Sequence, residues 1–404
     1  MKKLVQINPV IRENTSTGKI MRELGEMAIS SGWESYIVYS RARDGIKPHS
    51  SRLVPVGNRI DLLCHWLATR LFDAHGLASR MTTRRLVNKL KEIDPDIIHI
   101  HNIHGYFLNY PILCDYLAKC GKTVIWTVHD CWLYTGHCYY YSSIGCDRWI
   151  SGCHDCPNKK GFPASYVSDH SARNYRYKRR LFTSIPGLKL VAVSRWIKEE
   201  LGRSFLSGVP CLCIHNGIDT SVFKPVSTTM EYGIKAPVYY LAVASIWLQE
   251  KGLPDLISLA GMLYEDEQIV VVGRLTARQK ASLPDNVLTI ERTADASSLS
   301  ALYSAATALV NPTWQDNYPT VNLESIACGT PVVTYRTGGS VESVVPETGY
   351  VVEKGDVNAL ADRIHEIRSQ GREGWQRSCR DYAVRHFDKE ESFRQYIQLY
   401  ESCV

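Results

Sequence analysis

The chain has 404 residues, which at roughly 150 residues per domain predicts two or three domains and excludes a single small module. Hydrophobic residues make up 45% and charged residues 22%, as in ordinary soluble globular proteins and unlike disordered or fibrous ones. The formal net charge is +6, and this mild excess, interspersed along the chain, does not by itself indicate a nucleic-acid partner.

Two features of the sequence argue against export and against a membrane span. The longest run without a charge or a helix breaker, residues 296–311, contains several Ser and Thr hydroxyls and is shorter than the ~18 to 20 residues of a spanning helix. The apolar residues after Lys3 end at Asn8–Pro9, too early for the core of a signal peptide. We therefore expect a cytoplasmic protein, whose 13 cysteines favour buried thiols or a metal over disulfides.

The first half of the chain alternates short β-rich runs with amphipathic stretches, the pattern of parallel βαβ units. Apolar residues from Ile20 to Ala28 share one helical face, and Ser31–Gly32 ends that helix. Strands are predicted at residues 4–7, 36–39, 97–100, 124–128, 189–193 and 212–214.

The alternation restarts after a turn at Asn216–Gly217–Ile218–Asp219 and a polar stretch to Lys235. Apolar residues at helical spacing from 253 to 260, with Pro254 in the first turn, predict a helix. Strands are predicted at residues 238–243, 269–272, 287–290, 308–310 and 331–334. The two halves predict an α/β protein of two doubly wound domains, with ligands bound at the carboxyl ends of the strands in the cleft between domains.

Residues 311–333 have the pattern of a strand, a loop, a helix, a glycine cap and a second strand. Asp316 lies in the loop and Glu324 in the first turns of the helix. Carboxylates placed there can accept hydrogen bonds from sugar hydroxyls, while the N–H groups at the helix start favour a phosphate. Taken alone, the two acids can equally be a loop acid and a helix-dipole partner.

The same segment closely resembles the donor-binding signature of retaining GT-B glycosyltransferases of family four, in which two glutamates eight apart are followed by Ala-x-Ala-Cys-Gly-x-Pro-Val-Val. Asp316 stands at the first glutamate and Ser325 at the first alanine. The resemblance spans nearly the whole chain, is strongest from 205 to 355, and implies a GT-B fold of two Rossmann-like domains. It implies that Glu324 binds the nucleotide ribose and that the donor is also bound by Asp316, Asn317, Tyr318, Pro319 and Thr320.

A second matching segment, residues 244–253, follows a predicted strand and opens a helix. The family has a Gly-Arg pair and then Lys-Gly here, so that two cations neutralise the leaving diphosphate. Lys251–Gly252 matches, whereas the arginine position falls on Ile246. The resemblance therefore implies that Lys251 and Ser245 bind the donor, with Arg274 after the next strand as a substitute for the missing arginine.

Two positions in the first half also match the family. Gly18 lies where the family has a glycine-rich turn near the donor phosphates, and a plain helix-entry turn is the alternative. His129 follows the strand at 124–128, where family members place a histidine near the donor sugar, and a structural histidine is the alternative. The catalytic residues implied are His129, Lys251 and Asp316. Asp94–Pro95–Asp96 precedes a strand and is interpreted as a strand-entry turn, not a metal site.

The segment of about 131–160 is rich in cysteine and aromatic residues. A Cys-x-x-Cys pair can hold one tetrahedral ion from a tight turn, and two further cysteines complete a thiolate set. The sequence therefore predicts a structural zinc, with buried free thiols as the alternative. The predicted ligands are Cys138, Cys146, Cys153 and Cys156.

Residues 173–180 contain five cations and two tyrosines. Such a stretch can bind an anionic membrane surface, which would suit a lipid-linked acceptor, or it can be a solvated helix face. Near the C-terminus, Phe393, Tyr396, Ile397 and Tyr400 have helical spacing and must be buried. In the GT-B fold the final helix packs back on the first domain, which implies the same for residues 385–404.

The resemblance implies a retaining, metal-independent hexosyltransferase that moves a sugar from a nucleoside-diphosphate-sugar to a hydroxyl of a glycan acceptor in cell-surface polysaccharide synthesis. No catalytic cofactor and no nucleic acid are expected. The implied domains are 1–216 on the acceptor side, 217–384 for donor binding and 385–404 as the crossing helix.

Two other functions stay open. A nucleotide-sugar epimerase of the same fold would turn over the donor without an acceptor, and a non-enzymatic, basic, zinc-containing binding protein would show strongly salt-dependent DNA binding. The pattern of Asp316, loop and helix favours the transferase over both.

Overall fold

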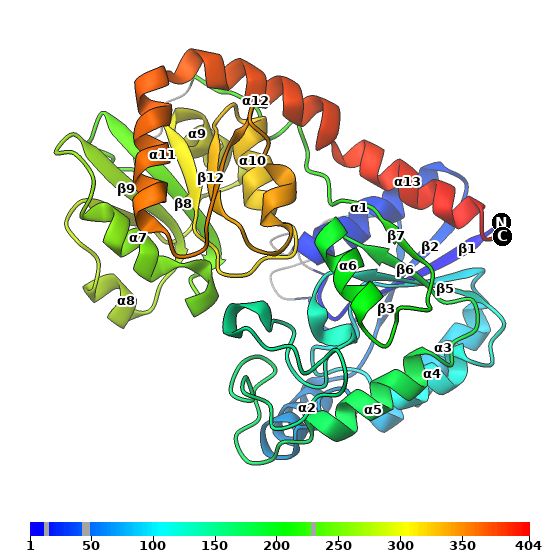
Figure 1. The fold of residues 1–404 in the computed structure, drawn as a ribbon. Helices are drawn as coiled ribbons and strands as arrows, with labels where there is room; N and C mark the ends of the chain where they lie inside the picture. The colour runs from blue at the N-terminus through cyan, green and yellow to red at the C-terminus, as the bar shows by residue number, and fades with distance from the viewer. Residues whose placement is uncertain (12–15, 43–48, 228–231) are drawn as a thin grey trace. The chain divides into compact units, whose positions relative to one another are not determined.

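The computed structural model describes residues 1–11, 16–42, 49–227 and 232–404. The chain forms two compact units, unit 1 (Met1–Ile214 with Phe393–Val404) and unit 2 (His215–Ser392) (Figure 1). Each unit is built on one sheet whose named strands all pair in parallel, with helices against the sheet. The predicted α/β class with two doubly wound domains is confirmed.

The sheet of unit 1 has the strand order β3-β2-β1-β4-β5-β6-β7. Its central strands are rich in Val and Ile and buried, as expected of a parallel sheet covered on both faces. The strands are β1 (Lys3–Ile7), β2 (Glu34–Tyr39), β3 (Arg52–Pro55), β4 (Ile97–Ile100), β5 (Thr123–Val128), β6 (Lys189–Ala192) and β7 (Cys211–Cys213).

The main helices of unit 1 are α1 (Ser16–Ser30), α2 (Arg59–Phe72), α3 (Arg80–Ile93), α4 (Tyr110–Leu117), α5 (Ser171–Phe182) and α6 (Arg195–Arg203). Two 3₁₀ turns, η1 (Cys131–Leu133) and η2 (Ser142–Ile144), lie in the long segment after β5. The predicted strand-entry turn before β4 is confirmed, because the Asp96 carboxylate accepts the backbone N–H of Lys3 at 2.7 Å and Asp94 pairs with Lys122 at 2.7 Å.

The sheet of unit 2 has the order β10-β9-β8-β11-β12-β13. Its strands are β8 (Val238–Ile246), β9 (Glu267–Arg274), β10 (Val287–Ile290), β11 (Ala308–Asn311), β12 (Val332–Tyr335) and β13 (Gly349–Val352). The helices and 3₁₀ turns of this part of the chain are η3 (Gln249–Lys251), α7 (Leu253–Ala260), α8 (Ala277–Ala281), α9 (Ala296–Ala305), α10 (Thr320–Ala327), η4 (Gly338–Ser343), α11 (Val357–Gln370) and α12 (Arg372–His386).

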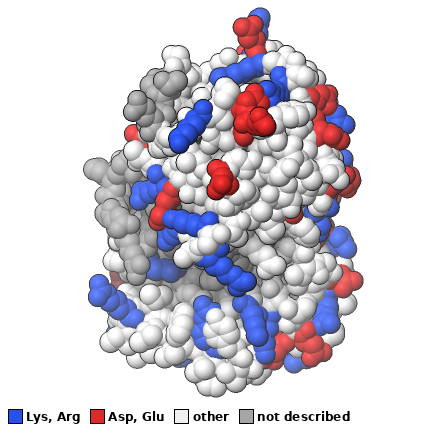
Figure 2. All heavy atoms as spheres, turned by 90° about the vertical axis from the view of Figure 1, so that its left-hand side faces the viewer, with Lys and Arg blue, Asp and Glu red and all other residues white. Residues whose placement is uncertain are grey.

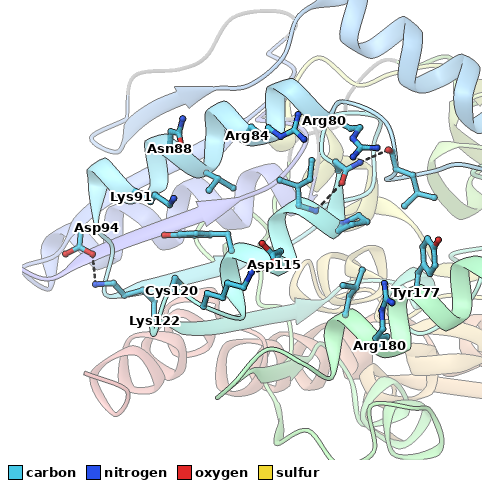
Figure 3. A pocket seen from close by; sticks show the side chains of 18 residues that line it. Arg80, Arg84, Asn88, Lys91, Asp94, Asp115, Cys120, Lys122, Tyr177 and Arg180 are labelled. Atoms are coloured by element: carbon cyan, nitrogen blue, oxygen red, sulfur yellow. Dashed lines mark hydrogen bonds and ion pairs between the residues drawn. The ribbon is translucent and has the colours of Figure 1, made fainter.

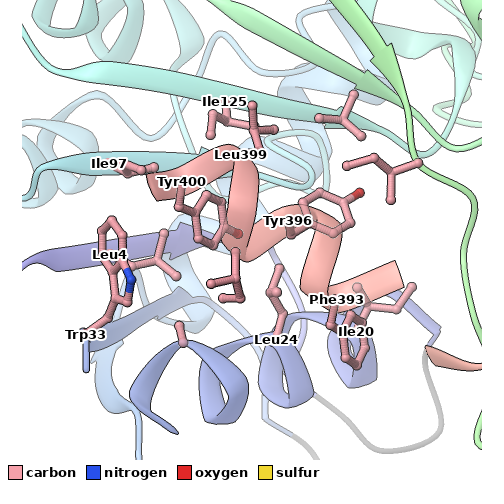
Figure 4. Packing of buried hydrophobic residues seen from close by; sticks show 14 residues of the cluster. Leu4, Ile20, Leu24, Trp33, Ile97, Ile125, Phe393, Tyr396, Leu399 and Tyr400 are labelled. Atoms are coloured by element: carbon pink, nitrogen blue, oxygen red, sulfur yellow. The ribbon is translucent and has the colours of Figure 1, made fainter. Parts of the chain in front are cut away.

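The last helix, α13 (Lys389–Glu401), contributes its second part to the core of unit 1. Figure 4 shows Phe393, Tyr396 and Tyr400 packed among side chains of α1 and of the strands β1, β4 and β5. The Tyr400 hydroxyl and Nδ1 of His99 on β4 lie 2.6 Å apart, and Tyr396 bonds to Thr127 on β5 at 3.1 Å. The C-terminal residues are therefore part of the fold of unit 1.

Candidate functional site

Two loops at the carboxyl ends of neighbouring strands of unit 2 are fixed to each other. The Glu250 carbonyl in η3, after β8, accepts the backbone N–H of Trp314 at 2.8 Å and the Thr313 hydroxyl at 3.2 Å, both from the loop after β11. Gly252 has φ +75°, and a Cβ there would collide with the carbonyl oxygen of Pro312. Only glycine allows the two loops to approach this closely, which explains why a glycine follows Lys251.

Lys251 and Asp316, both predicted from the sequence, meet where these loops touch. The Lys251 ammonium donates to the Asp316 carboxylate at 2.6 Å, and the backbone N–H of Gly339 donates to the Asp316 carbonyl at 3.1 Å. The side chains are 25% and 16% exposed, so the pair is held in place yet within reach of a ligand. The ion pair restricts the direction of the ammonium group.

Arg274 lies beside the position where the family arginine would stand. Ile246, at the end of β8, is in register with Arg274, at the end of β9, and the backbone N–H of Trp247 donates to the Arg274 carbonyl at 3.1 Å. Ser245, Ile246 and Arg274 are all exposed. The adjoining strand thus supplies a cation at the same edge of the sheet.

Glu324, on α10, is held by a residue that the sequence analysis missed. The Tyr303 hydroxyl on α9 donates to Oε2 of Glu324 at 3.0 Å, and Tyr303 is completely buried. Burial and this nearby carboxylate raise the pKa of Tyr303, so the phenol stays protonated and acts as the donor. A tyrosine in an apolar helix gives no sequence signal beyond core packing.

The remaining donor-side residues lead from the loop into α10. Asn317 and Tyr318 are buried, and the Tyr318 ring lies 4.8 Å from the ring of His215. Pro319 is the N-cap of α10 and Thr320 its first residue, so this helix begins four residues after Asp316 in the chain.

The two positions predicted in unit 1 lie on different elements. Gly18 is a buried residue in the first turn of α1, whereas residues 12–15, which precede this helix, fall outside the described residues. His129 follows β5, and its Nε2 lies 3.1 Å from Nδ1 of His101, which follows β4. Burial lowers the pKa of His129 to about 4, so this imidazole is neutral at physiological pH.

A hydrogen-bond chain determines which nitrogen of His129 carries the proton. The Gln6 amide NH₂ donates to the Met21 carbonyl at 2.9 Å, so its oxygen accepts from Nε2 of His101 at 3.1 Å. Nδ1 of His101 must then accept, and Nε2–H of His129 is its donor. Nδ1 of His129 therefore carries the lone pair.

The buried histidines of unit 1 make stability pH-dependent. Burial lowers the pKa of His65 to about 4 and of His99 to about 3, and it also lowers the pKa of His75 and His101. The unfolded state binds more protons below the ordinary value of 6.5, so each imidazole lowers the unfolding free energy by up to about 1.4 kcal/mol per pH unit below it. We expect the urea midpoint of unit 1 to fall between pH 7 and pH 5, and a constant midpoint would contradict neutral burial.

The four cysteines predicted as zinc ligands do not form a metal site. Across residues 1–11, 16–42, 49–227 and 232–404, no three His, Cys, Asp or Glu side chains are grouped so that they could hold one ion. Cys153 instead accepts the backbone N–H of Gly136 at 3.1 Å. Cys138 donates to Cys156, which lowers the pKa of Cys156 to about 7. The zinc prediction is therefore not supported by the described residues.

Solved structures share this architecture over the full chain. Sucrose-phosphate synthase from Thermosynechococcus elongatus is 18% identical with a TM-score of 0.72, covering 100% of this chain and 99% of its own. Anabaena HepE, solved in complex with UDP-glucose, is 14% identical with a TM-score of 0.70, covering 100% of both chains. The fold, with its residues at the carboxyl ends of β8 and β11, is that of the GT-B glycosyltransferases.

Sequence comparisons give the family. The model "Glycosyltransferase Family 4" matches residues 17–222, and the model "Glycosyl transferases group 1" matches residues 237–370. The putative colanic acid biosynthesis glycosyl transferase WcaC of Escherichia coli K12 is 23% identical over 374 residues, covering 88% of this chain and 89% of its own. The chain belongs to glycosyltransferase family 4, and the resemblance inferred from the sequence is confirmed.

Proposed function

We propose that this glycosyltransferase moves a sugar from a nucleoside-diphosphate-sugar to a hydroxyl of a glycan acceptor, with retention at the anomeric carbon. The observation that carries the proposal is the Lys251–Asp316 pair beside the start of α10, with Glu324 four residues into that helix. Similarity to a protein named for colanic acid biosynthesis supports a role in making a cell-surface polysaccharide. We propose that the acceptor of this reaction is lipid-linked.

Charge stabilisation at the diphosphate is the chemistry that unit 2 can supply. The Lys251 ammonium donates to a phosphate oxygen, Arg274 adds a second cation from the next strand, and the N–H groups of the first turn of α10 favour the developing negative charge. The bond from the anomeric carbon to the diphosphate oxygen breaks, and the bond to the acceptor oxygen forms on the same face. The acceptor proton passes to the departing diphosphate oxygen. In the proposed reaction Lys251 and Arg274 neutralise the diphosphate in place of a metal ion.

In this proposal, Glu324 recognises the ribose of the nucleotide. Its carboxylate can accept hydrogen bonds from paired ribose hydroxyls while the Tyr303 hydroxyl holds Oε2. In unit 1, we assign His129 to a hydroxyl of the donor sugar and Gly18 to close backbone approach. Gln6 and His101 then act as positioning residues, because they fix the tautomer of His129.

A panel of nucleotide sugars tests this function. A donor present at 100 times its dissociation constant should stabilise the protein by about 2.7 kcal/mol, which thermal unfolding detects. Incubation with the stabilising donor and a glycan acceptor should then give a product with retained anomeric configuration, with or without a chelator. Inverted product or loss of transfer with chelator would contradict the mechanism, and donor isomerisation without acceptor would favour an epimerase.

Tyr303→Phe should weaken nucleotide-sugar binding about fivefold, since it removes one hydrogen bond to a charged group. Tyr239→Phe is the matched control, because the Tyr239 hydroxyl is also buried but donates to the Leu302 carbonyl at 2.6 Å, without contact with Glu324. Titration by calorimetry compares the two variants. Equal losses would assign Tyr303 a purely structural role.

A further inference from the structure

Helix α2 of unit 1 buries polar side chains and exposes apolar ones, which is the reverse of the pattern expected for a helix that packs on a protein core. Its buried side chains are the polar residues His65 and Thr69. Its large apolar side chains are exposed, from Ile60 at 72% to Leu71 at 40%, except for the partly buried Leu62. The exposed apolar residues of the helix are Ile60, Leu63, Trp66, Leu67, Leu71 and Phe72.

Specific polar contacts fix this orientation. Nδ1 of His65 lies 2.9 Å from the Ser79 hydroxyl, and Nε2 of His65 accepts the backbone N–H of Gly76 at 2.8 Å. The Thr69 hydroxyl donates to the His65 carbonyl at 2.9 Å and lies 3.3 Å from Nδ1 of His75. Rotating α2 to bury its apolar residues would break the bonds to Ser79, Gly76 and His75, so the exposed apolar face is built into the fold.

Neighbouring segments extend the apolar face. The backbone N–H of Tyr166 donates to the Arg70 carbonyl at 2.8 Å, which places residues 166–168 along the last turn of α2. Tyr166 and Val167 are both more than half exposed, and so is Met81 at the start of α3. The Arg70 guanidinium lies over the rings of both Trp66 and Tyr166, at 5.5 and 5.2 Å from their centroids.

We use the name "α2 surface" for α2 together with residues 80–85 and 159–168. It carries seven cations and one acid, Asp61, whose carboxylate caps α2 by accepting the backbone N–H of Asn58. The cations are Arg59, Arg70, Arg80, Arg84, Arg85, Lys159 and Lys160. In Figure 2, Lys and Arg side chains (blue) lie among uncharged ones (white) toward the lower end of the face shown, with Asp and Glu side chains (red) at its right edge.

A basic groove adjoins the α2 surface between α3, α4 and α5 (Figure 3). Its two acids are neutralised, Asp94 by Lys122 and Asp115 by Lys119. Within the described part of the chain, its other cations have no carboxylate partner: Arg80, Arg84, Lys91 and Arg180. Of the basic run at 173–180, Lys178 is buried, while Arg176, Arg179 and Arg180 are exposed.

We propose that the α2 surface docks on an anionic phospholipid bilayer, with α2 lying in the plane of the interface. Its leucines and isoleucine would enter the boundary between headgroups and acyl chains, Trp66 and Tyr166 would lie at headgroup level, and the arginines would contact lipid phosphates. None of the helices in the described ranges is long and apolar enough to cross a bilayer.

Charge favours a membrane over a second copy of the chain. A symmetric dimer through this face would bring the seven cations of one copy against those of the other, whereas an anionic bilayer complements them. The inference rests on the proposed function in one respect, since docking would bring the enzyme to a lipid-linked acceptor in the bilayer. Binding to lipid itself requires no sugar transfer.

Sedimentation with vesicles tests the proposal on the full chain. The protein should bind vesicles of phosphatidylcholine and phosphatidylglycerol (3:1) and bind pure phosphatidylcholine at least tenfold more weakly. Leu63→Gln with Leu67→Gln should reduce binding to the anionic vesicles more than tenfold. Leu212→Gln is the matched control, because Leu212 is a 49% exposed leucine of unit 1 on the edge strand β7.

The charges are tested separately. Arg84→Glu with Arg85→Glu should weaken binding to anionic vesicles at least about fivefold for each arginine removed. The same reversal at Arg372 and Arg377, exposed on α12 of unit 2, should leave binding unchanged. All of these side chains are exposed, so circular dichroism and the urea midpoint should match the unmodified protein.

Three outcomes would overturn the proposal: no vesicle binding by the unmodified protein, equal binding to neutral and anionic vesicles, or dimerisation that Leu63→Gln with Leu67→Gln abolishes. Thermal stabilisation by the nucleotide sugar, measured on the same preparations, keeps this test separate from the proposed function. A protein that binds the donor but no vesicles refutes the docking alone, and one that binds vesicles but no donor refutes the donor site alone.

Discussion

Replacing Lys251 by alanine should lower kcat/KM for sugar transfer at least tenfold while the protein stays folded. The substitution removes a charge-assisted hydrogen bond to the diphosphate, worth roughly 1.5 to 3 kcal/mol. It also leaves the Asp316 carboxylate, now bonded at 2.6 Å to the ammonium, as an uncompensated negative charge beside the leaving group. Both effects act against the same transition state, so the loss should exceed that of either alone.

Lys280→Ala is the control for the Lys251 experiment. Lys280 is a lysine of the same unit, 45% exposed, whose partner is Glu291 at 3.4 Å. Its replacement should leave transfer within a factor of two. Unchanged turnover in a folded Lys251→Ala protein would remove this lysine from the donor site, and Asp316→Asn would then show whether the carboxylate acts without it.

Tyr400→Ala should destabilise unit 1 by about 3 to 5 kcal/mol, the cost of truncating a large aromatic side chain in a packed core. Tyr400 is fully buried, its ring packs edge-on against Trp33 at 5.8 Å, and its hydroxyl is the partner of Nδ1 of His99. The substitution therefore leaves both a cavity and a buried imidazole nitrogen without its partner.

Urea unfolding followed by Trp fluorescence measures the change in unit 1. Gln398→Ala, an exposed position on the same helix, should change the unfolding free energy by less than about 0.5 kcal/mol. A loss of less than about 1 kcal/mol for Tyr400→Ala would show that the last turn of α13 contributes little to the core of unit 1.

Strands with continuous apolar runs could be predicted from sequence, and two edge strands could not. Residues 97–100 and 287–290 were predicted with the observed bounds of β4 and β10. The edge strand β3 (Arg52–Pro55) is mostly exposed and ends in proline, so it lacks both an apolar run and alternation. β13 begins at Gly349, which has a φ of +145° and no side chain, so the start of this strand adds nothing to an alternating apolar pattern in the sequence.

Local motifs identified Lys251, Asp316 and Glu324, whereas the contacts among side chains required the structure. The Lys251–Asp316 bond depends on how two loops 65 residues apart pack. The Tyr303–Glu324 bond depends on the packing of α9 against α10. The burial of His65 in α2 runs against the helical pattern, which by itself would turn the leucines inward. Tertiary contacts decided each of these cases.

The position of α13 has a consequence for the order in which the chain can fold during synthesis. Unit 2 is continuous from His215 to Ser392, so all of its residues are synthesised before the second part of α13. Unit 1 lacks Phe393, Tyr396 and Tyr400 until the whole of unit 2 has been translated. A nascent chain that has passed Ile214 therefore still exposes the apolar side chains of α1 and β1 against which α13 packs, and unit 1 completes its core only after residues 393–400 have been synthesised.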